Sequence, residues 1–341
     1  MQQKEMPIKK GNHLKIRDGR LDSIKGFLIL TVILAHMNNL GPGSSICHYT
    51  NNFVCLFNMP LFVFVSGYVS NTLSKRFFIS TFGLIEIYLI YQAYYQFSSN
   101  QIIDFAWPYK HLWYLPCLFV WRLLDHITKK WNTSCLLFIA IILAVLCGFA
   151  ERISHWLSLS RLICFSVFYL LGRLCREKDV LSGVLYKIQK KYGYGVILMT
   201  LFGLLFITEL GKVFLLAEPY TYLSTNIYKG CLIRMTFMVY TTFLCMAVII
   251  SSRENKVMKY IGQITLPIYV YHEALVTLVS EMNTIFSLPL NIFIFIFAIL
   301  IYVATFCYLT KFIDFNWLLH PITYSIEKFQ SNHSLKQTSK V

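Results

Sequence analysis

The stretch DSIKGFLILTVILAH, Asp22 to His36, carries the feature that decides the fold. It begins with charged residues, continues through apolar or near-apolar residues and ends on a histidine. A run of this kind is typical of a helix that enters a lipid bilayer. Lys25 at the start of the run and His36 well inside it are costly to place in lipid, so each needs a structural or functional explanation.

The composition extends this interpretation to the whole chain. Of the 341 residues, 56% are hydrophobic and only 14% are charged, and the mean hydropathy is +0.56. A balance this apolar is far from that of a soluble domain and favours a membrane protein. The 31 Lys and Arg exceed the 16 Asp and Glu; in a membrane protein this excess orients the loops, and we expect no nucleic-acid partner.

Ten apolar runs predict about ten transmembrane helices in an all-α polytopic bundle. The runs lie near 24–41, 53–70, 77–97, 112–124, 135–150, 161–174, 193–215, 230–251, 261–282 and 288–310. If the runs alternate across the membrane, most basic residues fall on the side of the N-terminus, so both termini are predicted to be cytoplasmic.

Three parts follow from this assignment. Residues 1–23 form a basic cytoplasmic N-terminal segment, 24–310 the transmembrane domain, and 311–341 a cytoplasmic tail that we expect to be disordered from about Gln330. No cleavable signal peptide is visible, so the first run is expected to be retained as a signal anchor.

The cysteines and the standard motifs add little. Ten cysteines lie mostly within apolar runs, without a C-x-x-C pair. Cys47 and Cys55 would form a disulfide only in an oxidising compartment, and free thiols are the favoured alternative. Zinc-ligand spacing, a phosphate-binding glycine loop, a G-x-S-x-G elbow and a dinucleotide fingerprint are all missing, and no metal site is expected.

Two histidines inside apolar runs are the first candidate site residues. His36 lies about 18 Å into the first run, and His272 about 17 Å into the ninth, which enters from the same face. At equal depth, both side chains could line one cavity. A histidine at mid-membrane can serve as a general base, while hydrogen bonding to a neighbouring helix remains open for each.

Polar residues elsewhere give weaker signals. His111 begins the fourth run at the predicted outer face, where it either reaches a substrate or belongs to an aromatic belt. Arg161 opens the sixth run against the charge trend and either snorkels or binds an anion. In the second run, Pro60 predicts a kink, Ser66 is a buried polar group, and Gly67 permits close approach of another helix.

Several segments occur in a recognisable order. Asp22, Lys25 and His36 form a pattern of an acid, a basic residue three positions later and a histidine eleven positions after that. The segments MPLFVFVSGYV, HLWYLPCLF, SRLICFSVFYLLGRLCRE and YIGQITLPIYVYHEAL follow along the chain. Together they resemble acyltransferase family 3 of bacterial membrane proteins, and most closely its fucose 4-O-acetylase-like branch. Many members have Arg at the position of Lys25, and Thr265 replaces a family serine.

The resemblance implies a function. Such enzymes transfer an acyl group, commonly acetyl, from cytoplasmic acyl-CoA to a hydroxyl of a lipid-linked or polymeric cell-envelope sugar. We therefore expect a multi-pass protein of the bacterial cytoplasmic (inner) membrane with acyl-CoA as co-substrate, no bound cofactor, and membrane lipids and the sugar acceptor as partners. The chain lacks the W-S-L-x-x-E motif of the O-antigen branch and an appended hydrolase-like domain.

The resemblance also implies roles for residues. His36 would be the catalytic base or a transient acyl carrier. Lys25, about 16.5 Å away along the helix and on nearly the same side, would hold a phosphate of CoA. The possible acceptor or cavity contacts are His111, Arg161, His272 and Ser66.

Two other classes of function stay open. A transporter or polymerase of envelope glycans would also have many helices and buried polar residues. A sensor or scaffold could keep the fold without activity, which the intact Lys25–His36 spacing opposes only weakly.

Overall fold

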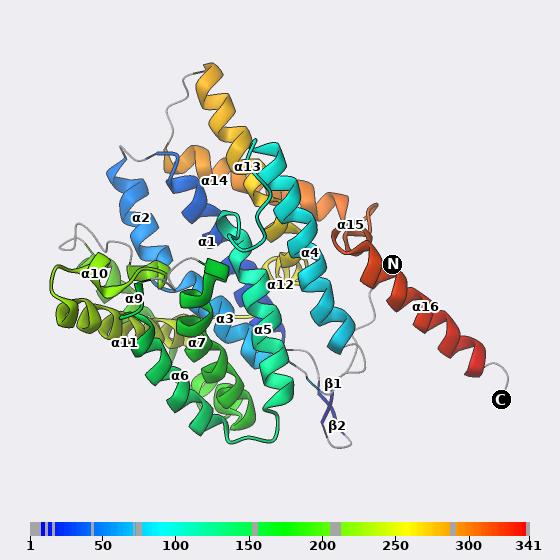
Figure 1. Ribbon diagram of the computed structural model, residues 1–341, viewed down its shortest axis with the longest axis horizontal. Helices are drawn as coiled ribbons and strands as arrows, with labels where there is room; N and C mark the ends of the chain where they lie inside the picture. Colours follow the sequence, from blue (N-terminus) through cyan, green and yellow to red (C-terminus); the bar gives the residue numbers. More distant parts are fainter. Residues whose placement is uncertain are drawn as a thin grey trace.

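The chain folds into a bundle of helices preceded by a short β-hairpin (Figure 1). The computed structural model describes residues 8–10, 13–15, 18–41, 44–70, 72, 77–151, 156–204, 213–286 and 291–338. The hairpin pairs β1 (Ile8–Lys10) with β2 (His13–Lys15) antiparallel.

The longer helices are α1 (Gly19–Asn38), α2 (Ser45–Cys55), α3 (Asn58–Val69), α4 (Phe77–Ser98), α5 (Tyr114–Ile127), α6 (Thr133–Cys147), α7 (Leu159–Glu177), α9 (Lys190–Gly203), α11 (Ile227–Ser251), α12 (Lys256–Gln263), α13 (Thr265–Phe286), α14 (Ile292–Leu309) and α16 (Pro321–Thr338). The short elements are η1 (Lys110–Trp113), η3 (Trp156–Ser158), α8 (Val180–Gly183), η4 (Leu185–Lys187), η5 (Val213–Leu215), α10 (Tyr220–Leu223) and α15 (Phe315–Leu319).

The helical class of the transmembrane region is confirmed. Within the described residues, six segments are long and apolar enough to cross a membrane: Gly19–Asn38, Ser45–Val69, Phe77–Ser98, Trp156–Glu177, Ile227–Ser251 and Ile292–Leu309. Each of the ten apolar runs coincides with at least one helix. The helices α5, α6 and α9 rise only about 21–23 Å against a bilayer core of about 30 Å, so the count of ten remains a prediction.

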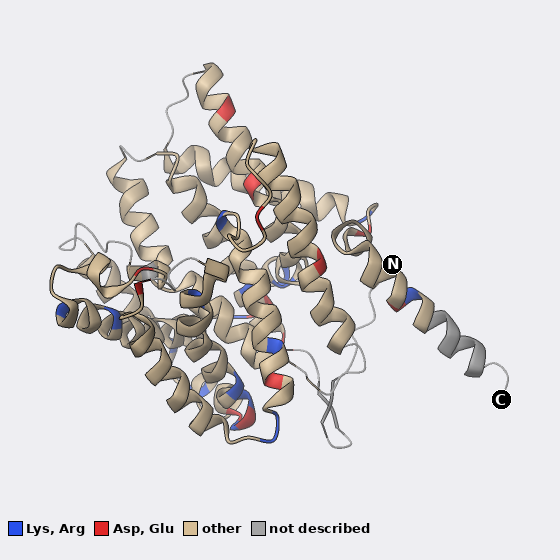
Figure 2. Cartoon of the chain, viewed as in Figure 1, with Lys and Arg blue, Asp and Glu red and all other residues tan. Residues whose placement is uncertain are grey.

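Charged side chains gather at helix ends. Figure 2 shows long uncharged stretches along the helices and a group of Lys and Arg where α5 turns into α6 and α7 ends. At this end of the bundle, Arg173 of α7 pairs with Asp125 of α5 at 3.0 Å. The Ser70 hydroxyl, just beyond α3, donates to the same carboxylate at 2.7 Å. We call this end, where α1 begins and α3, α5, α7 and α11 finish, the basic end.

The second apolar run is broken into two helices. α2 finishes at Cys55 and α3 begins at Asn58, with Phe57 between them outside helical geometry. Pro60 lies in the first turn of α3, where its missing N–H leaves no helical hydrogen bond unmade. The kink predicted at Pro60 is thus a full break, and it turns the polar residues around it toward the bundle interior.

Close helix packing follows the glycines. A Cβ on Gly67 of α3 would overlap the carbonyl of Tyr169 in α7, and one on Gly262 of α12 would overlap the carbonyl of Asp22 in α1. Only a residue without a side chain lets the backbones approach this closely. The close approach predicted at Gly67 is confirmed.

The C-terminal residues include α16, which continues to Thr338; the disorder expected from about Gln330 stays a prediction. The first turn of α16 is held by Glu86 of α4, whose carboxylate accepts from the backbone N–H of Ile322 at 2.6 Å and of Thr323 at 2.9 Å. A carboxylate at a helix N-terminus satisfies orphan N–H groups and favours the helix dipole. This long-range cap is not visible in the local polarity of the tail.

Candidate active site

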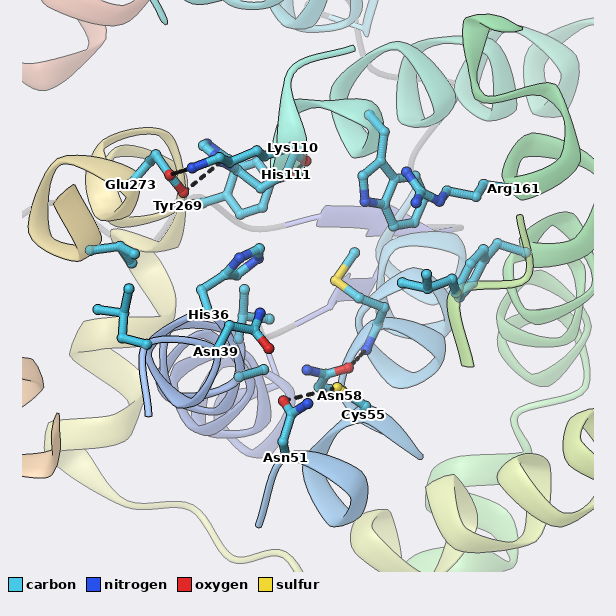
Figure 3. A pocket seen from close by; sticks show the side chains of 18 residues that line it. His36, Asn39, Asn51, Cys55, Asn58, Lys110, His111, Arg161, Tyr269 and Glu273 are labelled. Carbon is cyan, nitrogen blue, oxygen red and sulfur yellow. Dashed lines mark hydrogen bonds and ion pairs between the residues drawn. The ribbon is translucent and has the colours of Figure 1, made fainter. Parts of the chain in front are cut away.

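A cavity of about 550 Å³ lies between α1, α2, α3, η1, α7 and α13 (Figure 3). Its size falls within the range of small-molecule binding sites. Its polar lining comes from His36, Asn39, Asn51, Cys55, Asn58, Lys110, His111, Arg161, Tyr269 and Glu273. An interior cavity with this many polar groups between apolar helices indicates a functional site.

His36 reaches this cavity from the last turn of α1. α1 begins at Gly19, five residues before the predicted run, so His36 lies about 25 Å of helix rise from the basic end. The cavity is therefore in the half of the bundle away from the basic end.

Three histidines form a cluster beside the cavity. The ring centroid of His36 lies 4.9 Å from that of His272 and 6.1 Å from that of His111. The rings of His111 and His272 are 4.4 Å apart. The structure thus brings together three of the residues singled out in the sequence, one each from α1, η1 and α13.

His272 has a defined orientation. It is fully buried, and its Nδ1 lies 2.6 Å from the carbonyl oxygen of Tyr269, one turn earlier in α13. A carbonyl accepts only, so Nδ1 carries the proton and Nε2 keeps a lone pair. Nε2 is buried without a hydrogen-bond partner among the described residues. A histidine held in this way can accept a proton from a neighbouring group.

Glu273 stands next to His272 in α13 and is also buried. Its carboxylate forms an ion pair with the Lys110 ammonium, and its Oε2 lies 3.8 Å from Nδ1 of His111 (Figure 3). Lys110 adopts a positive φ of 38°, a conformation uncommon for a residue with a side chain. The ion pair fixes the turn that carries His111.

The opposite wall of the cavity carries a second cation. Arg161, in the first turn of α7, places its guanidinium 5.1 Å from the ring centroid of Trp113. Asn51 and Asn58, from the two sides of the α2–α3 break, supply amide groups below it (Figure 3). Amides and a guanidinium are suited to hold hydroxyl and anionic oxygens.

Two of the residues predicted from sequence lie elsewhere. The Ser66 hydroxyl is 2.7 Å from the Tyr114 hydroxyl, joining α3 to α5. Lys25 forms an ion pair with Asp22 at 2.6 Å within the first turns of α1. Neither residue lines the cavity, although Lys25 and His36 share a helix.

Several cavity residues were not selected from the sequence. Lys110 carried a usable signal, since it is one of the few basic residues outside the cytoplasmic segments. Glu273 also carried a signal, because a carboxylate inside an apolar run needs to face polar groups in the interior of the bundle. The asparagines Asn39, Asn51 and Asn58 gave none, because asparagine is ordinary at helix ends and turns.

The same cluster includes a set of metal-ligand atoms. Ligand atoms of His36, His272 and Glu273 lie within 4.8 Å of one another. The Lys110 ammonium occupies one carboxylate oxygen of Glu273, and a cation beside it opposes metal binding there. All ten cysteines are free. Cys47 and Cys55 both lie in α2, separated by about 12 Å of helix rise, which is too far for a disulfide.

Comparison with known families identifies the chain. A family model described as an acyltransferase domain, that of acyltransferase family 3, matches residues 18–311. The chain belongs to acyltransferase family 3. The matched range runs from the start of α1 through α14 and contains the whole cavity. No match was found among curated proteins or among solved structures.

Membership in acyltransferase family 3 gives the general activity. The protein is a multi-pass membrane protein with an acyltransferase domain. The resemblance seen in the sequence is confirmed at the level of the family, and the fucose 4-O-acetylase-like branch stays a prediction.

Proposed function

We propose that the protein transfers an acyl group, in particular acetyl, from cytoplasmic acyl-CoA to a hydroxyl of a lipid-linked or polymeric cell-envelope sugar in the bacterial cytoplasmic membrane. The observation that carries this proposal is His36, which faces a polar cavity in an acyltransferase domain and has His272 directly behind it. The alternative of glycan transport without acyl chemistry gains nothing from a buried histidine cluster.

In the proposed reaction, His36 acts as the general base. It takes the proton of the sugar hydroxyl as the oxygen attacks the acyl carbon of the thioester. A carbon–oxygen bond forms and the carbon–sulfur bond breaks. The proton held by the imidazole then passes to the departing thiolate, so that CoA leaves with a free thiol. The histidine ends the cycle neutral, and no other co-reactant is needed.

His272 serves this reaction from behind His36. Its Nε2 has no partner among the described residues, and the His36 ring is 4.9 Å away. In the proposed reaction a small rotation of the His36 ring brings an N–H to this nitrogen, which leaves the other His36 nitrogen as acceptor toward the cavity. This is the arrangement of a base held in one tautomer by a third group. The sugar would lie between Arg161 and the asparagine amides, and an anionic group on it, such as a lipid-linked phosphate, would face Arg161.

The test uses purified protein in nanodiscs with radiolabelled acetyl-CoA and a lipid-linked glycan extract from the source membrane. We expect label in the glycan with wild-type protein and none with His36→Ala. The matched control is His126→Ala, which removes a histidine that stacks on Phe77 at 5.2 Å, outside the cavity, and should retain transfer.

A second measurement separates the two roles of His36. For this test, the protein is incubated with labelled acetyl-CoA alone and denatured rapidly near neutral pH, because acid hydrolyses an acyl-imidazole. It carries no label if His36 is a base, and hydroxylamine-sensitive label if His36 is an acyl carrier. A folded His36→Ala protein with normal transfer rates would exclude both roles. Glycan movement without CoA would favour the transporter.

A further inference from the structure

A second cavity lies at the basic end of the bundle. Its volume is about 340 Å³, and α1, α9, α11 and α12 supply most of its wall. Ser23 and Phe27 of α1 line it, as does Phe57 at the α2–α3 break. The lining is largely apolar, and Arg253 lies at its rim. This site is distinct from the histidine cavity, and it was not predicted from the sequence.

Three cations lie at or near this second cavity: Arg253 lines it, Lys190 bonds to a lining residue, and Arg20 stands one turn before the lining residue Ser23 on α1. The Lys190 ammonium donates to the carbonyl of Ser252, a lining residue, at 3.0 Å. Partial desolvation and the nearby charges of Arg253 and Arg20 lower the pKa of Lys190. Arg20 in turn lies 4.3 Å over the ring of Tyr186. Three cations held this close together favour a ligand with several negative charges.

The acidic groups nearby do not neutralise this rim. Glu254 pairs with Lys259 at 3.2 Å. Asp18 accepts from the Tyr186 hydroxyl at 2.9 Å and from the backbone N–H of Arg20. Lys259 thus neutralises Glu254, whereas the partners of Asp18 are uncharged and its carboxylate offsets one cation. The three cations of the rim still outnumber this one acidic group, and Arg253 is exposed.

The two cavities adjoin at the α2–α3 break. Phe57 lines the second cavity, and its sequence neighbour Asn58 lines the histidine cavity. Phe57 stacks on Phe27 with ring centroids 6.0 Å apart. On α1, the residues of the second cavity end at Phe27 and those of the first begin at Val32, about 7.5 Å further along the helix.

We propose that the second cavity is the donor site: Arg20, Lys190 and Arg253 hold the phosphates of acyl-CoA, and its pantetheine arm passes the Phe27–Phe57 pair to reach His36. This inference rests on the proposed function and moves the phosphate site away from Lys25. The apolar wall suits the gem-dimethyl arm, and the cationic rim suits a pyrophosphate and a ribose phosphate.

The lengths agree. Ser23 and His36 are separated by thirteen residues of α1, a rise of about 20 Å. When fully extended, a pantetheine arm spans about 14 Å, which is the length of an extended polypeptide with the same number of backbone bonds. The phosphate oxygens at one end and the His36 side chain at the other cover the remainder.

Lys25 is a poorer anchor by the same criteria. Its ammonium is 2.6 Å from the Asp22 carboxylate, so the pair has no net charge to attract a phosphate. An anionic phospholipid would satisfy the same cations and the same apolar wall, so the experiment must tell the two sources apart.

The experiment measures binding of acetyl-CoA and of S-acetylpantetheine to full-length protein in phosphatidylcholine nanodiscs. Arg253→Gln and Lys190→Gln should each raise the Kd for acetyl-CoA about tenfold and weaken its dependence on salt. Both should leave the Kd for S-acetylpantetheine, which has no phosphates, unchanged; this also shows that the variants are folded. The control Lys129→Gln removes a cation in the α5–α6 turn and should change neither Kd.

Four outcomes would overturn the inference. If both variants bind acetyl-CoA as tightly as the wild-type protein does, the site is rejected but the proposed function is kept. If only Lys25→Gln weakens acetyl-CoA binding, the phosphate site returns to Lys25. Displacement of phosphatidylglycerol that depends on Arg253, with acetyl-CoA binding independent of it, makes the cavity a lipid site. A wild-type protein without affinity for acetyl-CoA rejects the donor and the proposed function together.

Discussion

The imidazole rings of His36 and His272 lie 4.9 Å apart, although α1 and α13 stand near opposite ends of the sequence. His36 lines the cavity, whereas His272 is buried behind it with Nδ1 bonded to the Tyr269 carbonyl. The two histidines are therefore not equivalent. In the proposed function, His36 meets the reacting groups and His272 orients His36.

Replacing His272 with Phe keeps an aromatic ring of similar shape and removes the lone pair at Nε2. We expect kcat to fall about 100-fold, with the KM for acetyl-CoA changed less than about twofold, because the donor does not touch this position. Steady-state kinetics over a range of pH provide the measurement. A rise in the KM for acetyl-CoA as large as the fall in kcat would indicate general damage to the fold instead.

The Lys110–Glu273 ion pair predicts a non-additive effect on stability. Lys110→Met leaves the buried carboxylate of Glu273 uncompensated and should destabilise the fold by about 2 kcal/mol. Adding Glu273→Gln should recover most of this loss. Thermal unfolding of both single variants and the double variant measures the coupling, and strictly additive effects would contradict the pairing.

Asp125 joins the ends of α3, α5 and α7. Its carboxylate accepts from Ser70 at 2.7 Å and pairs with Arg173 at 3.0 Å, and Arg173 is itself buried. Asp125→Ala leaves Arg173 with Glu177 as its ion-pair partner, at 2.9 Å, and removes the acceptor of the Ser70 hydroxyl, so it should cost about 1–3 kcal/mol. The specific activity of the folded fraction should be unchanged, since Asp125 lines neither cavity. A normal unfolding midpoint would show that the network is dispensable.

Gly67 and Gly195 give a matched pair of glycine substitutions. A Cβ at Gly67 would overlap the Tyr169 carbonyl, while a Cβ at Gly195 of α9 meets nothing within 4 Å. Gly67→Ala should destabilise by about 1–3 kcal/mol through forced separation of α3 and α7. Gly195→Ala should stabilise by about 0.5–1 kcal/mol through helix propensity. The two substitutions should shift the unfolding midpoint in opposite directions. Shifts in the same direction would refute the close contact at Gly67.

The orientation of the bundle can be tested with reporters active on one side of the membrane. Fusions after Lys130, Val184 and Glu254, all in loops at the basic end, should report the cytoplasm. Fusions after Ile103 and Thr225 should report the outside. An outside signal at Val184 would reverse the predicted orientation.

Much of the fold could be predicted from hydropathy, because apolar runs and helices respond to the same bilayer constraint. The run that begins at residue 24 became α1, and Gly67 became a close contact. The break at Phe57 was foreseen only as a bend at Pro60. The helix through the polar tail was missed, since its N-terminus depends on Glu86, far away in the sequence.

The site could be predicted only where a residue violated the local pattern. His36 and His272 were found because histidine is rare inside apolar runs. Lys25 looked equally unusual, yet its ion pair with Asp22 satisfies it locally. The rim at Arg253 was missed because a lysine or arginine in a cytoplasmic loop is ordinary. Its importance comes from its position near Arg20 of α1 and Lys190 of α9, residues far apart in the chain, which one sequence does not display.

The stacked rings of Phe27 and Phe57 affect how readily ions could leak through the protein across the membrane. A protein with one chamber toward each side risks becoming a conduit for protons and sodium ions. Two aromatic faces between the chambers offer a passing ion no replacement for its hydration shell, so the barrier to conduction stays high. When no donor is bound, the stacked pair would therefore let the proposed enzyme sit in an energised membrane without dissipating its proton gradient.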